Sequence, residues 1–179
     1  MKEKKTFGTR ELVTAAVLLA ICLVAQLFKN TSVFITGPVI NACLILCILL
    51  CGWVPSIILC ILTPITSAFI TGAPIMQAVP VLMPLIMVGN AILVIFVGMI
   101  GHKTNVRLIL GMGAGSLVKA IVMGLTISYG VLPHMLPEKM AKMLPALQAQ
   151  FSIVQLITAL IGSVYAFIIW TAWKKAGKN

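Results

Sequence analysis

The chain has 179 residues, of which 61% are hydrophobic and 9% charged, and its mean hydropathy is +1.15. Soluble domains carry about 25% charged residues, so this chain has too few polar side chains to cover a water-soluble globule. Its formal charge is +10, but nucleic-acid binding needs a solvated basic face, which a chain this apolar does not offer. The composition therefore predicts an all-α polytopic membrane protein.

Six apolar segments are candidates for membrane-spanning helices, each of which takes about 20 residues. They cover residues 11–28, 39–52, 55–70, 80–100, 106–129 and 151–173. The second and third segments are short, and Gly52 followed by Pro55 favours a tight turn between them. One long kinked span is the alternative, but it gives an odd number of crossings. We therefore expect a single domain, residues 1–179, with six transmembrane helices.

Basic residues indicate the orientation, because cytoplasmic connections of membrane proteins are enriched in lysine and arginine. Three basic residues, Lys29, Lys139 and Lys142, fall on the side opposite to the N-terminus. The basic residues on the side of the N-terminus are Lys2, Lys4, Lys5, Arg10, Lys103, Arg107, Lys174, Lys175 and Lys178. This asymmetry predicts that both termini are cytoplasmic.

The three outer connections, residues 29–38, 71–79 and 130–150, are longer and more apolar than the cytoplasmic ones. The third is expected to contain a short interfacial helix. Its apolar face would consist of Met135, Leu136, Met140, Met143 and Leu144. Such connections fit either loops that fold over a pocket or loops that rest on lipid headgroups.

Several kinds of chemistry leave no mark on the sequence. The expected spans hold no acid or histidine well inside them for a proton relay, and the chain has no G-x-x-x-x-G-K-[ST] motif for ATP hydrolysis. Cys43, Cys47 and Cys51 share one helix face, where three thiolates suit a soft metal, but no histidine or acid joins them. We expect these cysteines to be packing groups, and we expect no metal site, no cofactor and no enzymatic activity.

The run GMGAGS, residues 111–116, superficially resembles a dinucleotide-binding loop. A genuine loop of that kind follows a strand and opens a helix, whereas this run lies within an apolar helix. Gly111 and Gly115 are instead expected to let another helix approach closely.

Lys119 lies about 10 residues, or ~15 Å, from the outer end of the fifth span. An ammonium near mid-membrane costs about 2.5–3.5 kcal/mol on insertion scales. A role in a ligand pocket, helix packing with water, and snorkelling to the interface are the three interpretations. Because the side chain reaches only part of that distance, we favour the pocket.

Further polar side chains fall in the outer halves of the expected spans. They are Asn41, Thr63, Thr66, Asn90, Ser128, Tyr129 and Gln155. Each fits an interhelical hydrogen bond taken alone. Since the inner half is nearly featureless, their common depth favours a pocket that opens outward.

Ala16 and Ala20 form a small-x-x-x-small pattern in the first span. This pattern fits either packing within the bundle or an exposed surface for a partner helix.

The chain resembles the substrate-binding S components of energy-coupling factor (ECF) transporters, which take up vitamins in prokaryotes. Members of that family carry A-x-x-x-A on the first helix, which here reads Ala16-Val-Leu-Leu-Ala20. The stretches ITGPVINA (35–42) and PVLMPLIMVGNA (80–91) are similar to the folate- and pantothenate-type branch.

The resemblance implies a multi-pass protein of a prokaryotic plasma membrane that binds a small vitamin-like or aromatic compound from outside. It implies a pocket in the outer halves of helices four to six, capped chiefly by the first outer connection. It also implies a transmembrane coupling subunit that docks on Ala16 and Ala20, two ATPases, and toppling of the S component in the bilayer. The candidate substrate-binding residues are Phe34, Ile35, Asn41, Gln77, Asn90, Lys119, Tyr129 and Gln155.

Lys119 would suit a substrate with a carboxylate or another anionic group. The alternatives to this function are a self-sufficient secondary transporter or small channel, for which sodium coupling through backbone carbonyls needs no acid, and a scaffold or sensor without ligand.

Overall fold

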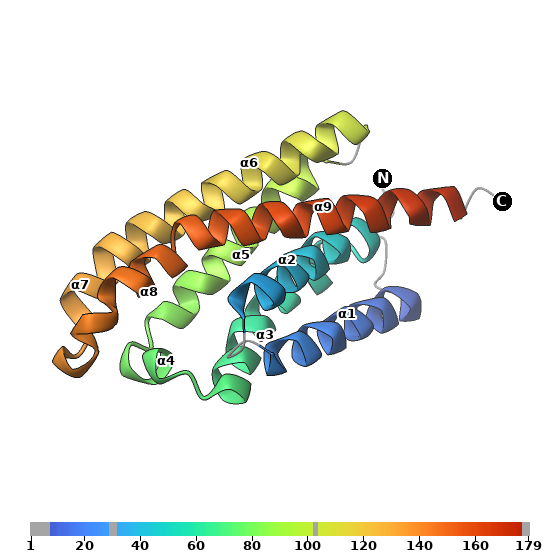
Figure 1. The fold of residues 1–179 in the computed structure, drawn as a ribbon. Helices are drawn as coiled ribbons and strands as arrows, with labels where there is room; N and C mark the ends of the chain where they lie inside the picture. The colour runs from blue at the N-terminus through green and yellow to red at the C-terminus, as the bar shows by residue number, and fades with distance from the viewer. Residues whose placement is uncertain (1–7, 29–31, 102–103, 177–179) are drawn as a thin grey trace.

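A computed structural model describes residues 8–28, 32–101 and 104–176 of the chain, and these residues contain helices and no strand (Figure 1). Six helical segments in this part are long and apolar enough to cross a membrane. Their helices are α1 (Thr9–Leu27), α2 (Val33–Leu50), α3 (Trp53–Thr71), α5 (Leu82–Ile100), α6 (Asn105–Met123) and α9 (Ile153–Ala176). The expected all-α fold with six apolar spans is confirmed.

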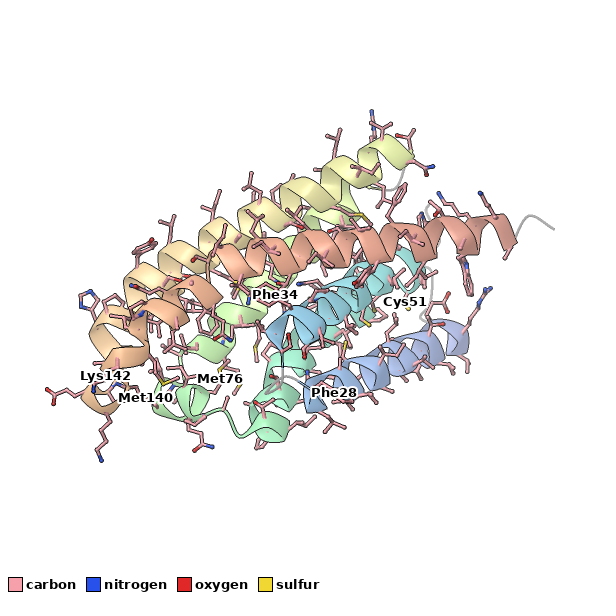
Figure 2. All side chains as sticks on the ribbon, viewed as in Figure 1. Phe28, Phe34, Cys51, Met76, Met140 and Lys142 are labelled. Atoms are coloured by element: carbon pink, nitrogen blue, oxygen red, sulfur yellow. The ribbon has the colours of Figure 1, made fainter. Side chains whose placement is uncertain are left out.

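Shorter elements gather at one end of the bundle, opposite the end at which Thr9 and Ala176 lie (Figure 1). They are α4 (Pro74–Ala78), the π-helix η1 (Gly124–Val131), α7 (Leu132–Met135), the 3₁₀-helix η2 (Glu138–Met143) and α8 (Leu144–Gln150). Figure 2 places Met76, Met140 and Lys142 at this end and Cys51 toward the other. We call it the capped end, and the other the terminal end.

Helix α2 begins at Val33, so the expectation that residues 33–38 belong to an outer connection is wrong. Pro38 lies inside the helix although proline usually ends or kinks one. Neighbouring helices make such a proline tolerable in a membrane span. Here the first turns of α2 pack directly against α9, where Gly37 approaches Thr158.

Gly52 separates α2 from α3 with φ of +83°, a conformation that favours glycine. The chain reverses there, and α2 and α3 are two spans, as the tight-turn interpretation predicted. Helix α2 then packs against α1, α3, α5 and α9, which makes it the central helix of the bundle.

Glycines allow the closest helix contacts. A Cβ added at Gly162 in α9 would lie 2.6 Å from the Pro38 carbonyl oxygen of α2. A Cβ at Gly111 or Gly115 in α6 would lie 3.1 or 3.0 Å from atoms of Phe96 in α5. The helix-packing interpretation of the GMGAGS run is therefore confirmed.

All five cysteines are buried. Cys22, Cys43, Cys47 and Cys60 belong to the apolar cluster that fills the middle and the terminal half of the bundle, with Leu44, Ile48, Leu93, Val94 and Val97 among its other members. The thiols thus serve as small packing groups.

The described basic side chains follow the pattern used to predict orientation. Arg10 and Lys174 lie at the terminal end, over the rings of Trp173 and Trp170 respectively. Lys2, Lys4, Lys5, Lys29, Lys103 and Lys178 lie outside the described residues. That the terminal end faces the cytoplasm stays a prediction.

The close contact at Gly162 yields a stability test. Gly162→Ala should force α2 and α9 apart, because the added methyl group meets a backbone oxygen, and such overpacking costs about 1–3 kcal/mol. Gly113→Ala is the matched control, since a Cβ there meets nothing within 4 Å, and alanine favours a helix by about 0.5–1 kcal/mol. Thermal unfolding in detergent, followed with a dye that reacts with the buried thiols only once unfolding exposes them, should show a lower Tm only for Gly162→Ala. Equal Tm values for the two variants would contradict the described α2–α9 contact.

Candidate functional site

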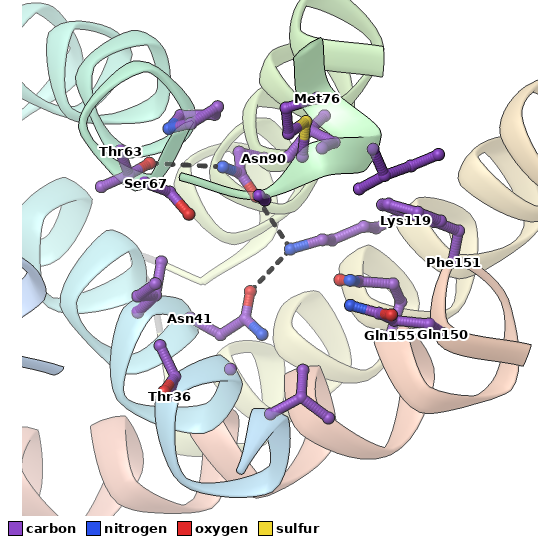
Figure 3. A pocket seen from close by; sticks show the side chains of 17 residues that line it. Thr36, Asn41, Thr63, Ser67, Met76, Asn90, Lys119, Gln150, Phe151 and Gln155 are labelled. Atoms are coloured by element: carbon purple, nitrogen blue, oxygen red, sulfur yellow. Dashed lines mark hydrogen bonds between the residues drawn. The ribbon is translucent and has the colours of Figure 1, made fainter. Parts of the chain in front are cut away.

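A lysine and two asparagines form the polar centre of the bundle. The Lys119 ammonium of α6 donates hydrogen bonds to Asn41 Oδ1 of α2 at 2.6 Å and to Asn90 Oδ1 of α5 at 2.9 Å (Figure 3). All three side chains are buried, and Lys119 is only 2% exposed. Three spans that are distant in sequence therefore meet at one charge.

The position of Lys119 follows from the pattern of α6. The buried face of this helix recurs every three or four residues, through Met112, Gly115, Ser116 and Met123, and Lys119 falls on it. The ammonium accordingly points into the bundle, and the snorkelling interpretation is wrong. Ion-assisted hydrogen bonds of about 1.5–3 kcal/mol each offset the cost of placing the charge in the membrane.

The hydrogen bonds continue from Asn90 to α1. Asn90 Nδ2 donates to Thr63 Oγ1 at 3.4 Å, and Gln26 Nε2 donates to the Thr63 carbonyl oxygen at 2.9 Å. Gln26 is fully buried, and its Oε1 has no partner among the described residues. Gln26 was not among the expected polar groups, although an amide within an apolar span is the same signal that identifies Asn90.

A cavity of about 130 Å³ adjoins this network, on the side of the capped end. Its wall combines the polar centre with residues from α2, α3, α5, α9 and the short elements. The lining residues are Val33, Thr36, Gly37, Ile40, Asn41, Thr63, Pro64, Ser67, Ala73, Ile75, Met76, Ile86, Asn90, Lys119, Gln150, Phe151 and Gln155. Four of the eight candidate substrate-binding residues thus share one cavity: Asn41, Asn90, Lys119 and Gln155.

The second and third spans contribute more to this wall than the resemblance implied. Thr63 was expected among the polar groups at this depth but not as a binding residue, and Thr36 and Ser67 were not expected at all. A hydroxyl within an apolar run is the signal that identifies all three. Gln150 lies at the end of α8, close to Gln155, and Figure 3 shows both amides beside Lys119.

The other four candidates do not line the cavity. Phe34 and Ile35 are 51% and 56% exposed, because the cavity face of α2 passes through Val33, Thr36 and Gly37. Gln77 is exposed on α4, whose neighbouring Met76 points inward.

Tyr129 is 68% exposed and lines a separate shallow apolar groove between α6 and α9. The π-helix η1 follows α6 at the capped end, and its wider turns change the register of side chains along the helix. As a result Ser128 faces inward, where its Oγ donates to the Gln148 carbonyl oxygen at 2.8 Å, and Tyr129 faces outward.

Toward the capped end, the cavity borders an apolar cluster, with which it shares Met76 and Phe151. The cluster includes Met76, Leu82, Met123, Leu147 and Phe151, and buried residues of α4, η1, α7 and α8 are among its members. The expected interfacial helix of the third outer connection appears as α7, η2 and α8, with Met135 and Met143 exposed. Residues 29–31 of the first outer connection lie outside the described residues.

Helix α1 presents a bare surface. Ala16 and Ala20 are exposed, so the small-x-x-x-small pattern does not serve packing within this chain. The surrounding side chains on the same helix are also exposed and apolar, and include Leu12, Val13 and Val17. Of the two interpretations of this pattern, internal packing is wrong.

The chain was compared with known proteins. The family model of the substrate-specific component of ECF transporters matches residues 10–173, a range that contains the polar centre, the cavity and Ala16 and Ala20. No curated protein and no solved structure matches the chain.

The polar centre predicts strong coupling between Lys119 and Asn41. Asn41→Leu and Lys119→Met should each lower the free energy of unfolding, the first because it leaves the ammonium with one amide partner fewer. The free energy of unfolding should fall less in the double variant than the sum of the two single losses predicts. The difference should be about 1.5–3 kcal/mol, measured by denaturant titration in mixed micelles. Asn41→Leu with Thr14→Val, a distant and only partly buried position on α1, is the additive control. Additive effects of Asn41→Leu and Lys119→Met would show that the 2.6 Å contact does not stabilise the protein.

Proposed function

The chain belongs to the family of ECF transporter substrate-specific components, and from this membership we propose that the cavity beside Lys119 captures a small vitamin-like or aromatic compound from outside the cell. The chain is thus a substrate-specific membrane subunit of a transporter rather than a member of an enzyme family.

One observation carries the proposal: a cavity lies next to a buried cation, in the half of the bundle nearer the capped end. Binding sites are concave and mostly apolar, with a few polar groups that fix the orientation of the ligand. Asn41, Asn90, Lys119 and Gln155 supply such groups, and Met76 and Phe151 supply apolar wall. We assign substrate binding to these residues.

A small channel would need a polar path along the bundle. The cluster of Leu44, Ile48, Leu93 and Val97 instead fills the space between the cavity and the terminal end with apolar side chains. This packing favours a binding subunit over a channel. It does not distinguish a binding subunit from a secondary transporter, for which the partner experiment below is decisive.

Energy for release would come from partners. The chain has no motif for ATP hydrolysis, and the family couples its members to a transmembrane subunit with two ATPases. We propose that the coupling subunit docks on the face of α1 around Ala16 and Ala20, whose small exposed side chains allow a partner helix to approach closely. Docking would then topple the subunit and expose the cavity to the cytoplasm.

The docking surface can be tested by copurification. Ala16→Trp and Ala20→Trp should abolish copurification of the coupling subunit and both ATPases from membranes, because the indole keeps the helices apart. Leu110→Trp on the exposed face of α6 is the control and should copurify as the unmodified chain does. Full retention of the ATPases by both alanine variants would refute the docking assignment, and uptake by the lone chain in ATP-free vesicles would favour a secondary transporter.

Substrate capture can be tested on the purified chain by mass spectrometry of the small molecules that denaturation releases. The unmodified chain and Ala16→Trp should carry the same compound. Lys119→Met should carry at least about tenfold less, since one ion-assisted contact contributes about 1.5–3 kcal/mol. Equal amounts in all three would place the binding site elsewhere.

A further inference from the structure

We propose that the cavity selects a small monoanion: a molecule with one carboxylate and an apolar body about the size of a single ring. The inference rests on the proposed function and deepens it by naming the class of substrate. Three properties of the wall support it, namely its charge, its free hydrogen-bond donors and its volume.

The wall has one cation and no acid. Lys119 is the one charged residue among the described lining residues, and the chain has no carboxylate between residues 12 and 137. A buried charge requires a partner of opposite sign or suitable hydrogen bonds. A monoanion would make the occupied cavity neutral, whereas a cation would meet a like charge and a dianion would leave a negative charge unpaired.

Free donors surround the same point. An ammonium has three N–H donors, and the Asn41 and Asn90 oxygens accept two of them, so one is left for a ligand. The Asn41 carboxamide is turned so that its oxygen faces Lys119, and its nitrogen makes no hydrogen bond within the described residues. The side-chain amides of Gln150 and Gln155 likewise have no such partner and lie beside Lys119 (Figure 3).

These donors match a carboxylate. An ionised carboxylate only accepts hydrogen bonds, through two oxygens, and its hydrogen bonds to ammonium groups are among the strongest in proteins. A neutral amide or alcohol would satisfy fewer of the donors, and an ammonium ligand would satisfy none. Asn41 and Lys119 are both more than nine-tenths buried, so water competes weakly for them.

The volume limits the rest of the molecule. A cavity of about 150 Å³ holds a benzene molecule, and this cavity measures about 130 Å³. Ile75, Met76, Ile86 and Phe151 give it an apolar wall away from Lys119. A single ring or a short branched chain therefore fills this volume, and two fused rings exceed it.

The test is a series of probes that differ in charge or size, applied to the full chain in lipid nanodiscs. Benzoate, benzamide and benzylammonium share one ring and differ in charge, phthalate adds a second carboxylate, and 2-naphthoate adds a second ring. Equilibrium dialysis should show that benzoate binds at least tenfold more tightly than each of the other four. Preference for benzamide or benzylammonium, equal binding of phthalate or 2-naphthoate, or no binding of benzoate would overturn the proposal.

Two variants separate specific binding from partition into lipid. Lys119→Met should reduce benzoate binding at least tenfold and benzamide binding by less, so that the preference for benzoate over benzamide is lost. Gln155→Leu keeps the charge, so it should weaken benzoate binding by less and preserve the preference for benzoate over benzylammonium. This second variant, together with the probe series on the unmodified chain, keeps the test decisive if Lys119→Met does not fold. Unchanged benzoate binding in a folded Lys119→Met would overturn the proposal.

The compound retained by the purified chain supplies an independent outcome. It should carry one carboxylate and no cationic group. A retained cation that copurifies together with the coupling subunit and ATPases would overturn the monoanion inference and leave the proposed function intact. Failure of the ATPases to copurify would count against the proposed function, whatever the charge of the ligand.

Discussion

The structure depends on one charged group, the Lys119 ammonium, whose burial in the membrane costs free energy and which the bundle keeps away from water. Two amide oxygens, from Asn41 and Asn90, compensate for the lost solvation, and they do so only if α2, α5 and α6 stay in register. The glycines of α6 let it approach α5 closely, and Gly162 does the same for α9 and α2. The charge thus fixes the arrangement of the helices at the depth where the cavity lies, and the proposed ligand recognition would use the same atoms that stabilise the bundle.

The polar network also explains how α1 is held. This helix is mostly exposed, and apolar burial contributes less to its position than it does for α2. Gln26 reaches the Thr63 carbonyl oxygen of α3, and Thr36 of α2 donates to the carbonyl oxygen of Ala25 at 3.1 Å. Inside a membrane such hydrogen bonds face little competition from water. The helix can therefore remain attached to the bundle while most of its apolar surface stays available to lipid or to another protein.

The sequence predicts the spans and the depth of the polar groups well, because long apolar runs and residue counts along a helix determine both. It does not predict which neighbouring residue faces inward. Tyr129 illustrates the difficulty: the π-helix that turns it outward has no signal in the sequence, and the adjacent Ser128 takes the inward position. The prediction that Phe34 and Ile35 line the cavity fails for a related reason. Helix α2 continues through Pro38 because of contacts with α9, and those contacts exist only in the folded bundle. The inward orientation of Lys119 was predictable, because an unpaired charge in a span has few places to point, and Asn41, Asn90 and Gln155 also line the cavity as expected.

The uneven distribution of polar groups bears on how a ligand would leave. From the cavity to the terminal end, the interior is the apolar cluster around Leu44, Ile48, Leu93 and Val97. A polar or charged ligand moved through that cluster would lose its hydrogen bonds, and Lys119 would again lack a counter-charge, so a path through a fixed bundle is costly. Reorienting the whole bundle avoids this cost, because the contacts at Lys119 remain intact while the cavity changes the side it faces. The force for such a movement must act on the outside of the bundle, and α1, with Ala16 and Ala20 exposed, offers a surface for it.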